Sequence, residues 1–214
     1  MDNPSLVFAL LSTQSPLLPE PWALRLYLDV AWGLVLAAVL LAVLPRRWLG
    51  VQLMRWLPLP LVLWCLLPGG VSPAHWLGLA LRAPSGLLVV LCVWSLWRVW
   101  RPGTPGPGAR QALRPWAWPL IALGWLLLLD TFALLPFSLY AWGFAPLLLG
   151  GLAALGLLPA LLARERAMPV LWMAVLLLFI LLRLPTGNVW DAVLDPMLWV
   201  WLQVDALRSL RRRV

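Results

Sequence analysis

The chain has 214 residues, of which 63% are hydrophobic and only 11% are charged. Soluble domains are about half apolar and about a quarter charged, so this composition excludes an ordinary soluble domain and indicates that lipid solvates much of the chain. The formal net charge is +8, but the basic residues are scattered over the gaps between apolar segments. That scatter argues against nucleic acid as a partner and favours anionic membrane lipid.

The first 21 residues precede the first long apolar segment and contain four prolines. The start of the chain, Met1-Asp2-Asn3-Pro4, lacks the basic region of a signal peptide, so no cleaved leader is expected. We expect residues 1–21 to form a short external tail and residues 22–214 to form a single transmembrane helical domain.

Seven apolar segments follow, and each is a candidate for a membrane-spanning helix, which needs ~20 mostly apolar residues. They lie at 22–44, 51–68, 84–101, 117–136, 144–163, 168–185 and 195–210. The last is the shortest and could instead lie along the interface, although Asp195-Pro196 is typical of a helix start. The sequence therefore predicts an all-α polytopic bundle of about seven transmembrane helices, six plus one that is short or interfacial. We expect residues 101–116, which are rich in Pro and Gly, to form a flexible cytoplasmic loop.

The basic residues give the bundle an orientation. All 16 are arginine, and 13 of them fall in every second gap between the apolar segments, at 46, 47, 55, 98, 101, 110, 114, 164, 166, 208, 211, 212 and 213. Because cytoplasmic loops carry an excess of Arg and Lys, we place these gaps in the cytoplasm, the N-terminus in the periplasm and the C-terminus in the cytoplasm. The lysine-free composition fits a GC-rich bacterial genome, so the expected location is a bacterial inner membrane. The chain is also tryptophan-rich, with 17 Trp, several of them near segment ends where aromatic belts form.

In this orientation, a group of polar residues converges at or near the external ends of the segments, where a charge in lipid would be costly. They are the candidate site residues Asp29, His75, Arg82, Asp130, Arg183, Asn188, Asp191 and Asp195. Two interpretations stay open. Asp29 or Asp130 pairs with Arg82 or Arg183 and only fixes helix register, or the group forms a polar pocket with Asp130 as its deepest acid. The segment Leu184–Asp191, rich in turn formers, is the most binding-site-like loop.

The segment at 144–163 contains small residues, including Gly150 and Ala154 four positions apart. This spacing permits close approach of two membrane helices. The contact could be made within this chain or with a partner subunit.

The chain lacks the phosphate-binding, dinucleotide-binding and metal-binding motifs and the nucleophile motifs of known enzyme classes. With a single His and no tight spacing of Asp and Glu, no cofactor and no metal are predicted. The favoured function is a non-catalytic inner-membrane subunit or assembly partner of a cell-envelope complex, with membrane lipid and other membrane subunits as partners. The first alternative is an enzyme acting at the external leaflet on a lipid-linked or isoprenoid substrate, and the second is a small proton-coupled transporter.

Overall fold

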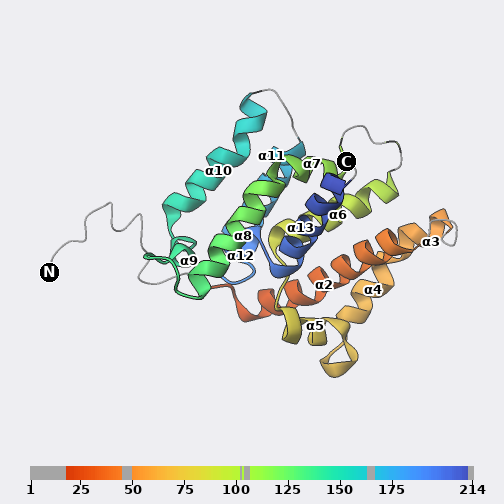
Figure 1. Cartoon of the computed structure of the whole chain (residues 1–214). Helices are drawn as coiled ribbons and strands as arrows, with labels where there is room; N and C mark the ends of the chain where they lie inside the picture. Colours follow the sequence, from red (N-terminus) through yellow and green to blue (C-terminus); the bar gives the residue numbers. More distant parts are fainter. Residues whose placement is uncertain (1–17, 45–49, 102, 104–106, 163–166, 212–214) are drawn as a thin grey trace.

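A computed structural model of the chain describes residues 18–44, 50–101, 103, 107–162 and 167–211 (Figure 1). All of the secondary structure in these ranges is helical, which confirms the all-α prediction. The longer helices are α2 (Pro21–Val43), α6 (Gly86–Trp100), α8 (Ala117–Thr131), α10 (Pro146–Leu161), α11 (Ala167–Leu182) and α13 (Pro196–Arg211). The shorter ones are α3 (Val51–Trp56), α4 (Pro58–Cys65), α5 (Pro73–Leu81), α7 (Ala109–Leu113), α9 (Leu139–Trp142) and α12 (Val189–Val193), with 3₁₀ turns at Gly69–Val71 and Arg114–Trp116.

Side-chain caps and prolines set several helix starts. Asp195 Oδ1 accepts a hydrogen bond of 2.8 Å from Leu198 N, and Pro196 is the first residue of α13, which confirms the expected start of this helix. In the same way, Ser85 Oγ accepts from Leu88 N at the start of α6. The N-terminal N–H groups of a helix have no partner within the helix, so these caps satisfy donors that would otherwise be unpaired.

Two expected segments differ from the structure. The segment 51–68 is divided into α3 and α4, which meet at Leu57, directly before Pro58. The interval 101–116, expected as a flexible loop, is helical from Ala109 to Trp116 and continues into α8. Part of that loop, and residues 1–17 of the expected external tail, lie outside the described residues.

Two helical stretches of the described chain are long and apolar enough to cross a membrane, Pro21–Val43 and Ala109–Thr131. α6, α10 and α11 are also apolar but have only 15 or 16 residues, which corresponds to ~24 Å, less than the ~30 Å hydrocarbon core. The described residues therefore do not show seven full-length spans. In the two long stretches, only 33% and 22% of the most apolar window is buried, so most of the apolar surface of these stretches is exposed. Their exposed apolar surface indicates membrane association.

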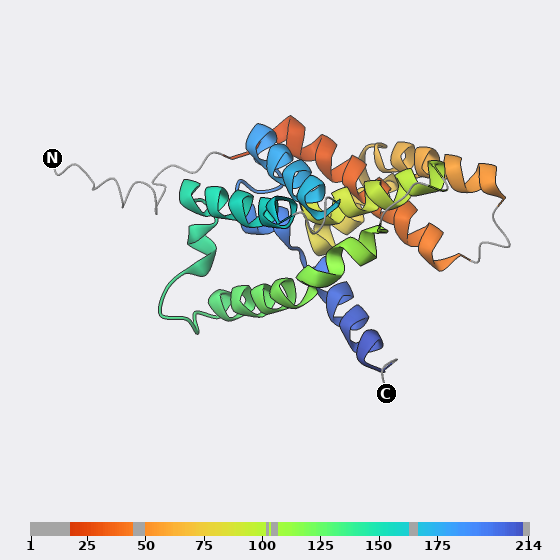
Figure 2. The ribbon, with the colours of Figure 1, turned by 90° about the horizontal axis from the view of Figure 1, so that it is seen from above.

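The helices pack in two groups. The larger core gathers buried residues of α6, α7, α8, α11, α12 and α13, including Leu87, Val175 and Leu198. In the other group, α2 packs against α4, α5 and α6, with Trp32 and Cys65 among its buried residues. Figure 2 shows α8 and α13 on one side and α2 and α4 on the other. In Figure 1, α9 and α12 lie toward the left and α5 lies at the bottom, whereas α3 lies at the right and α7 and the C-terminal end of α13 lie toward the top.

The contact between α2 and α4 depends on a glycine. A Cβ atom built on Gly33 would lie 2.7 Å from Val62 Cα, a backbone atom that cannot move without separating the helices. A Cβ atom on Gly151 of α10 would meet nothing within 4 Å. The two positions form a matched pair for testing how closely α2 and α4 are packed.

We predict that Gly33→Ala destabilises the protein by about 1–3 kcal/mol, the usual cost of overpacking. Gly151→Ala should leave stability unchanged or raise it, because alanine has the higher helix propensity. Thermal unfolding of both variants in the same mild detergent checks this. Equal melting temperatures for the two variants would contradict the close α2–α4 contact.

Candidate functional site

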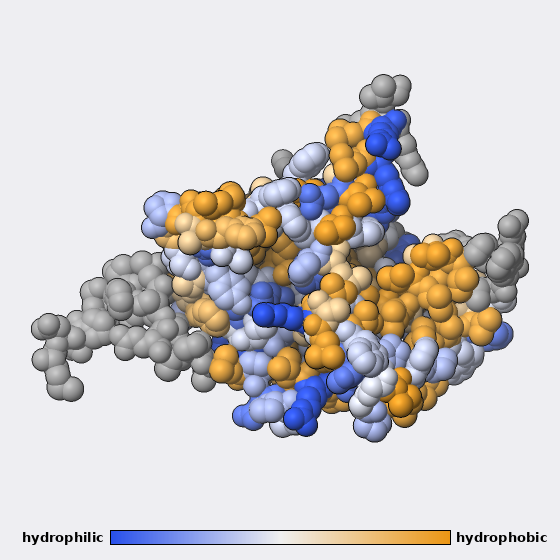
Figure 3. All heavy atoms as spheres, turned by 60° about the horizontal axis from the view of Figure 1, so that its bottom comes forward, coloured by the Kyte–Doolittle hydropathy of each residue, from blue (hydrophilic) through white to orange (hydrophobic). Residues whose placement is uncertain are grey.

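A polar cleft of about 280 Å³ lies between the end of α5, the loop after α11, α12 and the start of α13. It is lined by Leu81, Arg82, Ala83, Pro185, Thr186, Asp191, Leu194, Asp195 and Pro196. Three of the eight candidate residues, Arg82, Asp191 and Asp195, therefore line one cavity. Figure 3 shows that hydrophobic residues cover much of the face of the molecule that is turned forward in that view.

The turn of residues 82–85, which forms one wall of the cleft, is held by hydrogen bonds from two helices. From α2, Trp32 Nε1 donates to the Arg82 carbonyl at 3.0 Å and Tyr27 Oη donates to the Pro84 carbonyl at 2.7 Å. From the start of α13, Asp195 Oδ2 accepts from Ser85 N at 2.6 Å. Ser85 and Asp195 are both buried, so this charged acceptor is shielded from water and its hydrogen bonds are strong ones.

Arg82 has a strained backbone. Its φ of 62° and ψ of −156° fall in a region that is essentially reserved for glycine, and a non-glycine residue there costs about 1–3 kcal/mol. The hydrogen bond from Trp32 to the Arg82 carbonyl holds the residue in this conformation. Its exposed side chain lines the cleft.

Asp191 is the centre of the opposite wall. Tyr140 Oη and Thr186 Oγ1 both donate to Asp191 Oδ2, at 2.6 and 2.5 Å. Burial of the phenol, the hydrogen bond to Asp191 and the negative charge of that carboxylate raise the pKa of Tyr140 to about 12, against smaller lowering effects of Thr186 and Arg82. Asp191 thus links α12 to α9 and to the loop after α11.

Asn188 makes a second link between the same elements. Its Nδ2 donates to the Tyr140 carbonyl at 2.9 Å, and its Oδ1 accepts from Trp190 N as the cap of α12. Gly143 is required beside it, because a Cβ atom there would lie 1.8 Å from Asn188 Oδ1. Trp190 Nε1 donates to the Leu139 carbonyl at 2.9 Å. Both the nitrogen and the oxygen of the fully buried Asn188 side-chain amide therefore form hydrogen bonds with backbone groups.

Asp130 lies beside this network rather than in the cleft. Its Oδ2 accepts from Tyr140 N at 2.6 Å, which fastens the end of α8 to α9. It is half-buried and is not among the residues that line the cleft. The structure thus connects Asp130 to Asp191 and Asn188 through Tyr140.

The remaining three candidate residues are not brought into the cleft. Asp29 lies on α2 near Cys65, and the exposed His75 on α5 stands edge-on to Trp76, with 5.4 Å between ring centroids. The guanidinium of Arg183 lies over the Phe179 ring, 5.4 Å from its centroid. No ion pair joins Asp29 or Asp130 to Arg82 or Arg183, all four of which are described.

Three polar side chains of this network were not among the expected site residues: Tyr140, Thr186 and Ser85. Thr186 belongs to the loop that sequence analysis singled out, and Ser85 directly precedes Gly86 at the start of α6, a position where serine is a favoured cap. Nothing in the sequence separated Tyr140 from the aromatic residues around it. Its partners are 10 and 51 residues away along the chain, so only the fold brings them together.

The site offers no evident place for a metal ion. Among the residues that the structure describes, no group of three or more His, Cys, Asp and Glu side chains is close enough to hold one. The acids around the cleft instead accept hydrogen bonds from the chain itself.

Comparison with models of protein families, with curated proteins and with solved structures found no match to this chain.

The pKa of Tyr140 provides a test of its contact with Asp191. In a Tyr27→Phe background, Tyr140 is the only tyrosine, and we predict that its phenol titrates near pH 12. Asp191→Asn should lower this pKa toward 10, because it removes the negative charge. Ultraviolet difference absorbance of the phenolate measures both values.

The same shift carries a stability effect. The pKa is higher in the folded protein than the ordinary value of about 10, so the associated stability is fully present below pH 10 and is lost as the pH rises toward 12. Titration of Tyr140 at pH 10 in the folded Tyr27→Phe protein would contradict the hydrogen bond between Tyr140 and Asp191.

Proposed function

We propose that this chain is a multi-pass protein of a bacterial inner membrane, with a periplasmic N-terminus and a cytoplasmic C-terminus. In that membrane it serves as a non-catalytic subunit or assembly partner of a cell-envelope complex. The exposed apolar faces of its helices support the membrane location. The short apolar helices α6, α10 and α11, together with the α3–α4 pair, cross beside the two long stretches. α13, which is less apolar, either crosses as well or lies at the interface.

The arrangement of the helix ends supports the orientation. Arg110 and Arg208 belong to α7 and α13, near the ends that lie toward the top in Figure 1. Asp130 and Asp191 belong to the ends of α8 and α12 that lie toward the left, near α9. Basic residues of the predicted cytoplasmic side therefore lie at the opposite end of the helices from the acids of the predicted external side, as the positive-inside pattern requires.

The observation that carries the subunit proposal is the free small-residue face of α10. A Cβ atom on Gly150 or Gly151 would meet nothing within 4 Å, and Ala154 is exposed. Internal packing of α10 uses a different glycine, Gly156, whose Cβ would lie 3.0 Å from the Trp172 side chain. Small residues four positions apart allow two membrane helices to approach closely, and the spacing of Gly150 and Ala154 is not used within this chain.

α8 also lacks neighbours over much of its surface. Of its 15 residues, the buried ones are Leu120, Ile121 and Gly124, and they face α13. Trp118 and Trp125 are exposed on the same helix, and Phe132 is exposed directly after it. Aromatic side chains are enriched at the centres of protein interfaces, so this surface suits a partner helix.

The hydrogen bonds of the polar cleft favour a structural role for its acids. Asp195 caps α13 and accepts from Ser85 N, Asp191 accepts from two hydroxyl groups, and Asp130 accepts from Tyr140 N. These bonds stabilise the junction of four helices. A general base, in contrast, needs a carboxylate within hydrogen-bond reach of a substrate proton.

One observation favours the enzyme at the external leaflet as a second candidate function. Strained residues cluster at functional sites, and Arg82 is held in a strained conformation with its side chain on the cleft. An arginine fork suits a phosphate group of a lipid-linked substrate. Asp191 or Asp195 would be the acid beside it, rather than Asp29 or Asp130.

The proposed orientation is tested by cysteine labelling. Ser138→Cys, before α9, and Gly103→Cys, after α6, introduce thiols at exposed positions, whereas the native Cys65 and Cys92 are buried. A membrane-impermeant maleimide should label Ser138→Cys in intact spheroplasts and Gly103→Cys only after permeabilisation. The reverse labelling pattern would show that the topology is the opposite of the one proposed. Equal labelling of both variants without permeabilisation would contradict the proposed topology.

The subunit proposal is tested by purification of the tagged chain from its native host in mild detergent, followed by mass spectrometry. We expect another membrane protein in stoichiometric amount, and we expect Gly150→Leu or Ala154→Leu to release it by blocking the face of α10. Ala80→Leu, a comparable enlargement at an exposed position of α5, is the control and should retain it. A chain that purifies alone, as a monomer or only with copies of itself, would contradict the proposal.

A further inference from the structure

An apolar groove of about 220 Å³ runs between α2, α6 and α13, and α7 contributes Ala109 and Arg110 to its lining at one end. On α2 it extends from Val35 to Ala42 and on α6 from Leu88 to Ser95. Seven residues of helix correspond to ~10 Å, so the groove is a narrow channel about that long.

The polar character of the groove is confined to one end. Ser95, Arg110 and Trp201 are the three lining residues with nitrogen or oxygen in the side chain, and the others are apolar. Trp201 is the last of the α13 residues that line the groove, and Arg110 is the only charged residue in the lining. Ser95 is on the last turns of α6, and Arg110 is on α7, so both lie toward the end of the helices that carries the predicted cytoplasmic arginines. A guanidinium thus stands at the mouth of an otherwise apolar channel.

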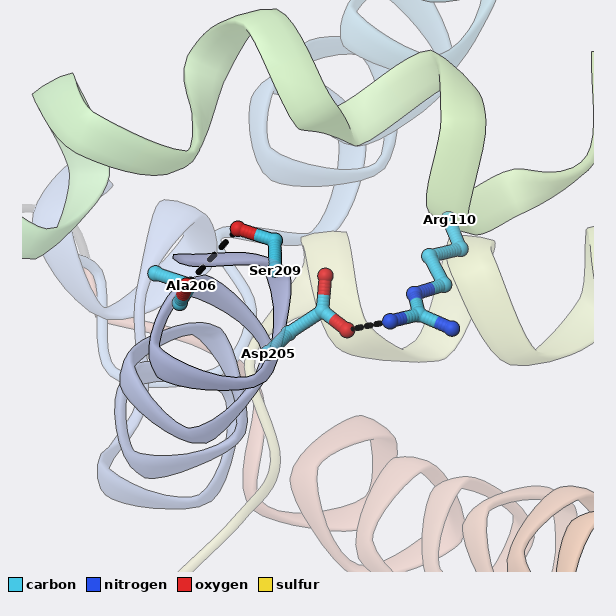
Figure 4. Close-up of polar contacts among 4 residues, drawn as sticks. All are labelled: Arg110, Asp205, Ala206 and Ser209. Carbon is cyan, nitrogen blue, oxygen red and sulfur yellow. Dashed lines mark hydrogen bonds and ion pairs between the residues drawn. The ribbon is translucent and has the colours of Figure 1, made fainter. Parts of the chain in front are cut away.

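Arg110 remains accessible although it has a partner. Its guanidinium forms an ion pair with Asp205 of α13 (Figure 4), while its side chain is 54% exposed. Exposed ion pairs contribute little to stability, and a guanidinium has five N–H donors. A second anion can therefore bind to Arg110 beside Asp205 or in competition with it.

We propose that this groove binds an anionic phospholipid of the cytoplasmic leaflet, with one acyl chain along α2, α6 and α13 and the phosphate on Arg110. Basic pockets between membrane helices on the cytoplasmic side are known sites for anionic headgroups, and arginine matches the geometry of phosphate. Asp205 competes with the phosphate for Arg110 and weakens binding. The inference rests on the membrane orientation in the proposed function but not on a partner subunit.

The test uses the full chain, delipidated in mild detergent and titrated with phosphatidylglycerol or with phosphatidylethanolamine, with native mass spectrometry as readout. The wild type should retain phosphatidylglycerol about fivefold more strongly, the contribution of one arginine near a membrane surface. Arg110→Gln should abolish this preference, and Asp205→Asn should raise it. Arg114→Gln, at an exposed arginine that does not line the groove, is the matched control and should keep the wild-type value.

A second variant tests the groove itself. Ala38→Phe fills the channel on α2 without changing any charge and should lower the retention of phosphatidylglycerol, with an unchanged melting temperature showing that the fold is kept. If Ala38→Phe unfolds the protein, displacement of bound lipid by an alkyl detergent of matching chain length replaces it. Inorganic phosphate should not compete, because it lacks the acyl chain.

Equal retention of the two lipids by the wild type, or an unchanged preference in Arg110→Gln, would overturn the inference. So would competition by inorganic phosphate, or a partner helix that crosslinks into the groove in place of lipid. These outcomes are independent of whether another protein co-purifies through α10, so a failure of this inference is distinguishable from a failure of the proposed function.

Discussion

The turn of residues 82–85 is the point on which the arrangement of the helices depends. Trp32 and Tyr27 of α2 donate to its carbonyl groups, and Asp195 accepts from its Ser85 N–H. The same carboxylate caps α13, and Ser85 itself caps α6. One short turn therefore fixes the relative positions of α2, α6 and α13. Because a buried polar group without a partner is costly, loss of the Asp195 carboxylate, which binds both the turn and the start of α13, would weaken the junction of α6 and α13.

A consequence of this arrangement is that the helices are joined at one end and diverge at the other. The hydrogen bonds around Asp195, Asp191 and Asn188 gather α9, α12 and the starts of α6 and α13. Toward the opposite end, α2, α6 and α13 leave an apolar groove between them, with Arg110 at its mouth. The groove begins at Leu88, Met197 and Leu198, next to Asp195 and Pro196 of the polar cleft, and runs from there toward the opposite end of the helices. The two cavities differ in chemistry.

The polar residues of this chain are few, and those around the cleft act mainly on the backbone. Asp130 accepts from Tyr140 N and Asn188 binds the Tyr140 carbonyl, so one short helix, α9, is held from both α8 and the loop before α12. The exposed Gly150–Ala154 face of α10 and the exposed aromatic residues of α8 have no such partner within the described chain. The polar groups around the cleft are hydrogen-bonded within the chain, whereas several apolar helix faces are exposed. This contrast is the physical basis for proposing a membrane subunit.

Much of the secondary structure could be predicted from the sequence, because hydropathy and helix-start residues act locally. The all-α class and the start of α13 at Asp195-Pro196 follow from apolar runs and from the preference of Asp and Pro for the first positions of a helix. Hydropathy alone does not give helix ends. The sequence therefore did not predict the break between α3 and α4 at Pro58 or the short lengths of α6 and α11.

The candidate site was likewise predicted only in part. The sequence identified Arg82, Asp191 and Asp195 as polar residues at the same ends of their segments, and these do line one cleft. It also grouped Asp29, His75 and Arg183 with them, since depth along a helix says nothing about the face on which a side chain lies. Only the tertiary structure decided which residues meet, because the partners of Ser85 and Tyr140 are up to 110 residues away along the chain. Hydrogen bonds over such separations depend on how helices pack, which no local pattern encodes.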